Sequence, residues 1–203
     1  MQEHANRGNA LDYIFDGNGL NEQQVHQFAI SLYKAMDFLG DNGIVHRSIQ
    51  PKHILINADS ENVLHAKLSS FRSAIIYWDP LVDDVINQPT RPVAQRIFSN
   101  FQGPEVFGND NELYNPVDAD VWSYGATMFF LISHVYPYDT TAKTIDKLDD
   151  EIKRNVNECK IDQNTKDWLC GLLRSNTVDR TDFDQIPQVA WFNLNWFVLS
   201  ATL

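Results

Sequence analysis

The sequence predicts a mainly α-helical domain that carries one small β hairpin. An amphipathic helix is expected over 21–39, where apolar side chains recur every three or four residues along one stripe. A second helix, expected over 118–132, becomes apolar on every face, which is typical of a helix surrounded by protein. Between them, 44–45, 54–56 and 63–68 have the composition of short strands, and the last two would pair as a hairpin across a polar turn.

The ends of these helices also have sequence signals. Asn21 can accept hydrogen bonds from the free N–H groups at the start of the first helix, and the Gly40-to-Gly43 stretch is expected to stop it. Pro137 is expected to end the second helix, because proline lacks the N–H that a helix needs. Three more helices are expected by periodicity, near 141–156, 165–173 and 183–196, with an apolar cluster formed by Trp168, Leu169, Leu172 and Leu173.

Composition excludes several functional classes. The chain has 203 residues, 43% of them hydrophobic, which suits one packed domain. Its net charge of −11 argues against nucleic acid or an anionic membrane as the main partner. Cys159 and Cys170 lack a paired metal-binding spacing and are expected to be reduced thiols. The first residues do not read as a signal peptide, so we expect a cytoplasmic protein, with the nucleus as a second compartment.

Five motifs occur in a fixed order along the chain. They are His46-Arg47-Ser48, Ser70-Phe71-Arg72, Gly103-Pro104-Glu105, the run 118–125 that contains Asp120, and Arg180. In this order they resemble the HRD loop, the DFG turn, the APE signature, the start of the central helix and the late arginine of eukaryotic protein kinases. The resemblance implies a protein-kinase-like carboxy-terminal lobe with a small β hairpin at the catalytic-loop region.

The resemblance also implies a division of the chain. It gives a post-hinge segment (1–20), a part with helix, catalytic loop and hairpin (21–69), an activation segment (70–105) and a helical subdomain (106–203). A Gly-rich phosphate loop and a strand lysine do not occur before Ile44, so the amino-terminal lobe is expected to be absent. We therefore expect no cofactor. ATP would bind, without metal, only if such a lobe is supplied.

Four positions depart from the kinase pattern. Ser48 stands at the position of the catalytic Asp, Gln50 at that of the loop Lys, His53 at that of the metal-binding Asn, and Ser70 at that of the DFG Asp. A neutral alcohol is a poor proton acceptor, and magnesium prefers carboxylate oxygens. The pattern predicts a pseudokinase that is not an enzyme. His53 would bind a transition metal only with further ligands nearby, so a hydrogen-bonded polar residue is favoured over a metal ligand.

The remaining motif residues are expected to be structural. His46 should be a packed, hydrogen-bonded core histidine, and Glu105 should pair with Arg180. Phe71 and Asp120 belong to the same structural set. Arg47 is expected to pair with an acid, either Asp83 or Asp84, or with a phosphate on Thr90 or Ser99.

The strings His46-Arg47-Ser48, His53-Ile54-Leu55-Ile56 and Arg72-Ser73 most resemble STRAD, the adaptor related to sterile-20-type kinases. This resemblance implies an allosteric activator of a liver-kinase-type serine/threonine kinase, assisted by a helical-repeat scaffold protein. Candidate partner-binding aromatics are Tyr77, Trp78, Phe98 and Phe101, although each would equally suit packing onto the lobe. The alternatives are a weakly active or atypical kinase using Asp59 or Glu61, and a truncated fragment that does not activate its partner.

Overall fold

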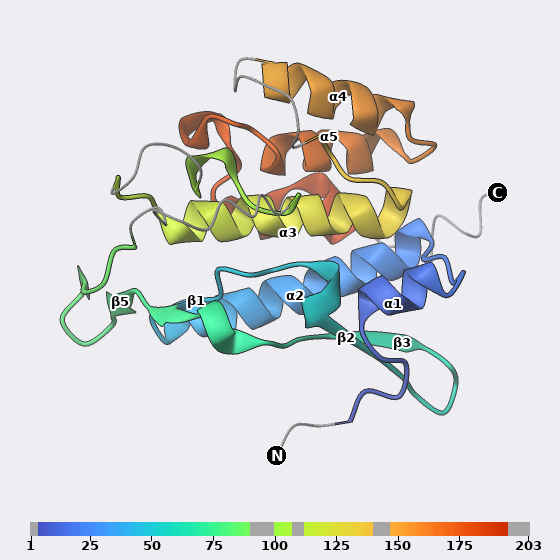
Figure 1. The fold of residues 1–203 in the computed structure, drawn as a ribbon, viewed down its shortest axis with the longest axis horizontal. Coiled ribbons are helices and arrows are strands. Elements are labelled where there is room, and N and C mark those ends of the chain that lie inside the picture. The colour runs from blue at the N-terminus through green and yellow to red at the C-terminus, as the bar shows by residue number, and fades with distance from the viewer. Residues whose placement is uncertain (1–3, 90–99, 107–111, 140–146, 195–203) are drawn as a thin grey trace.

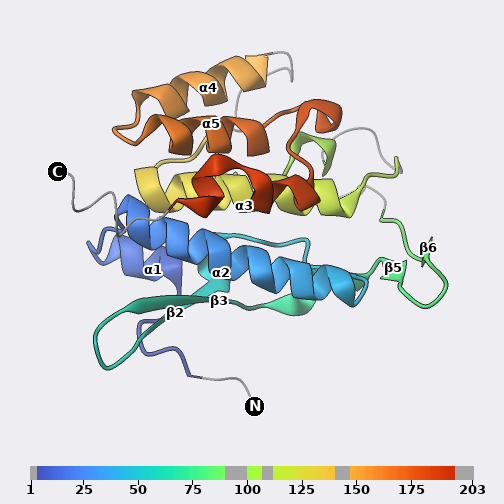
Figure 2. The same ribbon diagram turned by 180° about the vertical axis from the view of Figure 1, so that it is seen from behind.

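The structure is a computed structural model that describes residues 4–89, 100–106, 112–139 and 147–194. Its α-helices within these ranges are α1 (Ala10–Phe15), α2 (Glu22–Asp41), α3 (Pro116–Ser133), α4 (Leu148–Glu158) and α5 (Gln163–Leu172). Its strands are β1 (Ile44–Val45), β2 (Ile54–Ala58), β3 (Leu64–Leu68), β4 (Ile75–Ile76), β5 (Trp78–Asp79) and β6 (Asp84–Val85). The described part is thus mainly helical, as predicted, with two-stranded sheets at one side (Figures 1 and 2).

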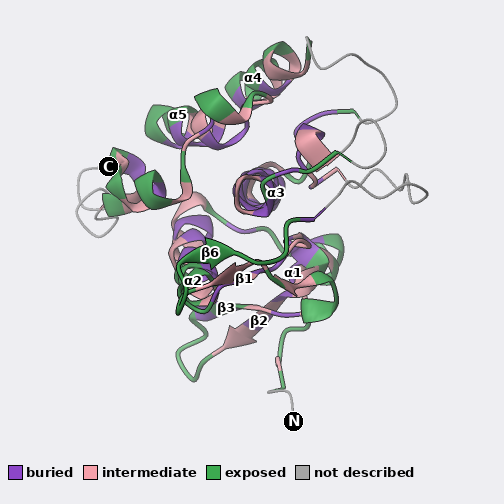
Figure 3. Cartoon of the chain, turned by 90° about the vertical axis from the view of Figure 1, so that its left-hand side faces the viewer, coloured by how far each residue is buried: buried purple, intermediate pink, exposed green. Residues whose placement is uncertain are grey.

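Helix α3 forms the centre of the described structure. It lies between α2 on one side and α5 on the other, and its residues are buried around nearly the whole helix (Figure 3). Its start is explained by Asn115, whose side chain accepts from the N–H of Val117, and by Pro116, which suits the first helical position. The helix ends at Ser133, where His134 turns into the left-handed region with φ 61°, so Pro137 is not its terminator.

Helix α2 has the predicted amphipathic character. Asn21 and Gln24 form a reciprocal capping box at its start, at 2.9 and 3.0 Å. Its end lies slightly later than predicted, because the helix includes Gly40 and Asp41 before the chain turns at Gly43, which has φ +70°. A Cβ at this glycine would lie 1.8 Å from the carbonyl oxygen of Trp78, so only glycine fits this close approach.

The predicted hairpin is present as antiparallel β2 and β3, in a register that places Ile54 opposite Leu68 and Ala58 opposite Leu64. The connection after it is more regular than expected. Its first part pairs with the chain before the loop, as β4 against β1, and then folds into a small β5–β6 hairpin. These strands have two residues each, which is too short for a hydrophobic period to reveal them.

The last predicted helix differs in type. Residues 183–193 form two 3₁₀ helices, η6 (Phe183–Gln188) and η7 (Ala190–Asn193), where an α-helix over 183–196 was expected. Pro187 lies inside η6 and has no N–H to donate to a carbonyl one turn earlier, which opposes a continuous α-helix. The end of the expected helix, including Trp196, lies outside the described residues.

The apolar cluster on α5 is buried, as predicted. Trp168, Leu169, Leu172 and Leu173 are each at most 4% exposed. The ring of Trp168 stacks on Trp191 of η7 at 3.7 Å, so α5 and η7 share one aromatic core. None of the helices in the described ranges has the length and apolarity needed to cross a membrane.

Candidate active site: the loop of His46, Arg47 and Ser48

The loop after β1 is held by a buried carboxylate. Asp120, on the first turns of α3, accepts from the backbone N–H groups of His46 at 2.7 Å and Arg47 at 2.8 Å. Burial raises the pKa of Asp120 to about 7, while these two hydrogen bonds favour its ionised form. One side chain of the central helix thereby fixes two successive peptide groups of the loop.

This clamp explains an unusual backbone conformation. Arg47 has φ 62°, in the left-handed region that most side chains avoid. Such a conformation costs on the order of 1–3 kcal/mol and persists only where the surroundings impose it. Asp120 imposes it here by accepting from the N–H groups of two successive peptide links, those of His46 and Arg47.

The expectation that Arg47 pairs with Asp83 or Asp84 is not met. Its Nε donates instead to the hydroxyl of Tyr114 at 3.2 Å, and neither aspartate forms an ion pair with it within the described ranges. Tyr114 was not predicted from the sequence, since it lies 67 positions away from Arg47 and belongs to no motif. The alternative partners Thr90 and Ser99 lie outside the described residues.

Both ring nitrogens of His46 form hydrogen bonds. Its Nε2–H donates to the carbonyl of Ser69 at 2.9 Å, and its Nδ1 accepts from the N–H of Ser48 at 3.3 Å. Burial lowers the pKa of His46, so the ring stays neutral. Phe71 packs edge-on against it at 5.0 Å while 50% of Phe71 stays exposed. His46 is therefore a core residue, as predicted.

Three of the substituted positions lie together. Ser48 Oγ accepts from the side-chain amide of Gln50 at 3.0 Å and lies 3.2 Å from Nδ1 of His53. The same Nδ1 lies 2.7 Å from the backbone carbonyl of Ser48. Position 53 is placed by the 3₁₀ helix η1 (Pro51–His53), which begins with a proline and leads directly into β2.

The fourth substituted position, Ser70, has φ 66° and precedes the short 3₁₀ helix η2 (Phe71–Ser73). Its neutral hydroxyl is a weak ligand for magnesium, which is usually held by carboxylates. Within the described ranges, no three His, Cys, Asp or Glu side chains are grouped so that they could hold a metal ion. The residues present do not fit a protein-held magnesium ion, and we assign no step to one.

The predicted pair of Glu105 and Arg180 is present and bidentate. Arg180 donates from Nη1 to Oε1 at 2.6 Å and from Nη2 to Oε2 at 3.0 Å. It also donates to the carbonyls of Arg174 and Asp118, and its guanidinium lies 5.0 Å from the centre of the Trp122 ring. Burial raises the pKa of Asp118, opposed by the charge of Arg180. The pair joins the end of the activation segment to α3 and the chain before η6.

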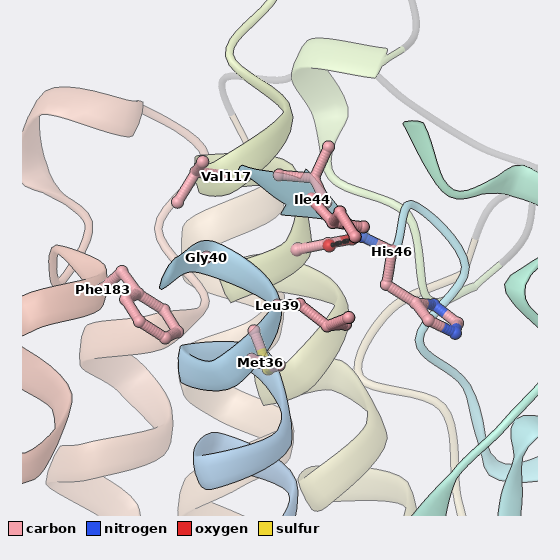
Figure 4. A pocket seen from close by; sticks show the side chains of 9 residues that line it. Met36, Leu39, Gly40, Ile44, His46, Val117 and Phe183 are labelled. Carbon is pink, nitrogen blue, oxygen red and sulfur yellow. Dashed lines mark hydrogen bonds between the residues drawn. The ribbon is translucent and has the colours of Figure 1, made fainter. Parts of the chain in front are cut away.

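A small cavity of about 50 Å³ lies behind the loop, between α2, β1, the start of α3 and η6. Figure 4 shows Phe183 and Val117 at one side of it, Met36 and Leu39 at its base and His46 at the other side. A cavity of this size is smaller than the ~150 Å³ that admits a benzene ring. It is therefore too small to be the nucleotide site.

The four aromatic candidates for partner binding separate into different environments. Phe101 is 7% exposed and packs edge-on against Phe130 and Tyr136, so its assignment to partner binding is corrected to the core of the lobe. Tyr77 and Trp78 are half-buried, and their backbone N–H groups donate to the carbonyl of Gly43. Phe98 lies outside the described residues.

The two acids suspected as substitutes for the catalytic Asp do not reach the loop. Asp59 lies in the turn between β2 and β3, where it accepts from the N–H groups of Glu61 and Val63 and binds His65 at 3.0 Å. Six residues of extended chain from His53 span ~20 Å, so Asp59 and its neighbour Glu61 lie at the far end of the strand. Their interactions are those of residues that stabilise the turn.

Comparison with known proteins agrees with this geometry. The sequence profile of the protein kinase domain matches residues 1–192. The chain belongs to this family. It is 27% identical over 199 residues to serine/threonine-protein kinase ppk25 of Schizosaccharomyces pombe, an alignment that covers 97% of the chain and 43% of that kinase. It is also 27% identical over 171 residues to serine/threonine-protein kinase STK11 of Mus musculus, which covers 83% of the chain and 36% of that protein.

A third relative is the CBL-interacting serine/threonine-protein kinase 26 of Arabidopsis thaliana, 24% identical over 96% of the chain and 42% of that protein. The kinase-like chain thus spans less than half the length of each of these relatives. Among solved structures, the Rad53 kinase domain and SCD2 in complex with AMPPNP matches with a TM-score of 0.69 and 18% identity. That match covers 95% of this chain and 68% of the other, and it supports the fold.

These comparisons correct one prediction from the sequence. The prediction that the protein is not an enzyme is wrong, because the family profile covers residues 1–192 and the relatives are named serine/threonine kinases. The substitutions at Ser48 and Ser70 do not outweigh the kinase motifs around them as evidence on this point. The chain is a serine/threonine-kinase-like domain.

Proposed function

We propose that this chain belongs to an atypical serine/threonine protein kinase that transfers phosphate slowly. The observation that carries the proposal is the clamp of Asp120 on His46 and Arg47, at 2.7 and 2.8 Å. It holds the loop in a strained conformation at Arg47, a residue that is only partly buried. Backbone strain of this kind is concentrated at functional sites.

The expected rate follows from what the site lacks. A positioned general base contributes about 10²–10⁴ to a rate, and ordinary protein kinases turn over at about 1–100 s⁻¹. Ser48 cannot supply the carboxylate that normally accepts the proton, and Ser70 cannot supply a carboxylate for metal. We therefore expect a turnover below the ~1–100 s⁻¹ of ordinary protein kinases.

The test is transfer of radiolabelled phosphate from ATP to a peptide library that contains serine and threonine, with the full-length protein that contains this chain as enzyme. Incorporation should be proportional to protein concentration in both magnesium and manganese buffers. His65→Gln, at the start of β3, is the matched control and should leave the rate unchanged, because its side chain is exposed and, among the described residues, binds Asp59 alone. Transfer that stays at the level of buffer alone would refute the proposal.

A partner-binding role is the second candidate, and one observation favours it. Leu81 is 92% exposed and Val82 64% exposed in the turn between β5 and β6. Adjacent exposed aliphatic side chains are typical of an interaction surface when they form one patch. The partner would be a serine/threonine kinase, with a helical-repeat scaffold protein as a third component, as the resemblance to STRAD implies. That narrower identity stays a prediction.

This second role has its own test. The full chain should raise the activity of an added liver-kinase-type partner, and Leu81→Ser with Val82→Ser should abolish that effect without lowering thermal stability, because both side chains face solvent. Leu113→Ser, at another exposed aliphatic position, is the control. Equal activation by the wild type and the double variant would contradict this use of the hairpin.

A further inference from the structure

The proposed reaction requires a group that takes the proton from the substrate hydroxyl, and the described loop offers few candidates. Ser48 and Gln50 are neutral and do not titrate usefully near neutral pH. Asp120 is buried and uses its two oxygens to hold two backbone N–H groups. His46 has both ring nitrogens engaged. None of these groups has a free basic atom beside position 48.

His53 differs from them in one respect. Its Nδ1 lies 2.7 Å from the carbonyl oxygen of Ser48, and a carbonyl oxygen can only accept, so Nδ1 must carry the hydrogen. In the neutral ring the lone pair is then on Nε2. Among the described residues, Nε2 has no hydrogen-bond partner. The loop carbonyl thus sets the tautomer that leaves the outer nitrogen basic.

The ring of His53 lies next to the position of the missing group. The hydroxyl of Ser48, which stands where the family has its proton-accepting Asp, is 3.2 Å from Nδ1 of His53. Residue 53 is half-buried, so part of it remains in contact with solvent. The backbone of residue 53 is also held in place, because its carbonyl accepts from both the N–H and the hydroxyl of Ser69, each at 2.9 Å. A ring anchored at its backbone and at Nδ1 has little freedom to turn away.

We infer that His53, through Nε2, is the catalytic base of this domain, replacing the aspartate lost at position 48. This inference rests on the proposed function. The serine or threonine hydroxyl of the substrate gives its proton to Nε2 as its oxygen forms a bond to the γ-phosphorus of ATP. The bond from that phosphorus to the bridging oxygen breaks, ADP leaves with the electron pair, and the imidazolium then releases its proton to water.

A kinetic experiment separates this role from a structural one. With the full chain, His53→Ala should lower kcat by roughly 10²-fold, at the lower end of what a positioned base contributes, while KM for ATP and the thermal unfolding midpoint stay unchanged. Added free imidazole should restore part of kcat in this variant, because it supplies the missing proton acceptor. The control His65→Ala should show neither the loss nor the rescue.

The possible failures are distinguishable. If the wild type transfers phosphate and His53→Ala transfers it equally fast, or if imidazole restores nothing, the base is another group and the proposed function stands. If the wild type transfers no phosphate, both proposals fail. A measurement that needs no turnover is ¹⁵N NMR of the histidine rings in their neutral form. It should show hydrogen on Nδ1 of His53 and none on Nε2, and the opposite tautomer would overturn the inference.

Discussion

Replacement of Arg180 by methionine gives the clearest test of how this lobe is held together. The arginine side chain is 2% exposed and that of Glu105 is 11% exposed, so their attraction is little screened by water. Arg180→Met keeps much of the side-chain volume against Trp122 but removes five hydrogen-bond donors. Two of the bonds lost go to Glu105, and two more go to the carbonyls of Arg174 and Asp118.

The size of the effect follows from this burial. Removing one partner of a buried pair typically costs ~3–5 kcal/mol, because the other charge keeps its desolvation penalty. The free energy of unfolding of such a domain is about 5–15 kcal/mol, so the variant should lose roughly a fifth or more of its stability. With a urea m-value of about 2–3 kcal/mol per molar, the unfolding midpoint should fall by roughly 1–2 M.

Urea unfolding followed by tryptophan fluorescence measures this shift. Arg72→Met, at an exposed position, should change the free energy of unfolding by less than about 0.5 kcal/mol. The double variant Glu105→Gln with Arg180→Met should be more stable than Arg180→Met alone, since it removes the facing charge. A midpoint for Arg180→Met within 0.3 M of the wild type, taken as roughly the error of the measurement, would refute the view that this pair is structural.

Three further outcomes are expected from unfolding measurements. Gly43→Ala should lower the free energy of unfolding by about 2 kcal/mol or more, because the φ of Gly43 is +70° and a Cβ would meet the carbonyl of Trp78. Gly40→Ala should raise it by about 0.5–1 kcal/mol, because a Cβ at this position on α2 meets open space. The pKa of Asp120 is raised by burial from 3.8 to about 7, so its contribution to stability should fall by ~4 kcal/mol between pH 4 and 7, a slope that Asp120→Asn removes. Burial lowers the pKa of His26 below 6.5, so its contribution is present above that pH and is lost on acidification, and His26→Gln should be less sensitive to acid than the wild type.

The elements that the sequence predicts well are those with a local physical signal. Helix α2 has both an apolar stripe and a capping residue at Asn21, and the structure begins it there. Helix α3 is apolar on every face and is indeed central. It begins two residues earlier than the motif suggested, and the Asn115-Pro116 pair, a typical helix start, indicated this.

The features that the sequence does not predict depend on contacts between distant positions. The pairing of β1 with β4 joins two strands of two residues each, and no periodicity can show this. The hydrogen bond from Arg47 to Tyr114 spans 67 positions, so charge alone suggested the wrong partners. The replacement of an α-helix by η6 and η7 was the exception, since Pro187 was a visible signal against a continuous helix.

The substitution of Ser48 shows why a motif gives the position of a group but leaves its chemistry open. From the sequence alone, replacement of the catalytic Asp by Ser48 removes the proton acceptor from the loop. The structure places a histidine ring 3.2 Å from that serine hydroxyl, and the carbonyl of the same serine fixes which nitrogen of the ring is bare. Histidine is a better proton acceptor near neutral pH than a hydroxyl. The presence of a histidine at position 53 does not predict that it can act as one until its neighbours in the structure are known. If the ring of His53 proves to carry its hydrogen on Nε2, the loop has a kinase frame but no base in the described residues, and the slow transfer proposed here would need a group from elsewhere.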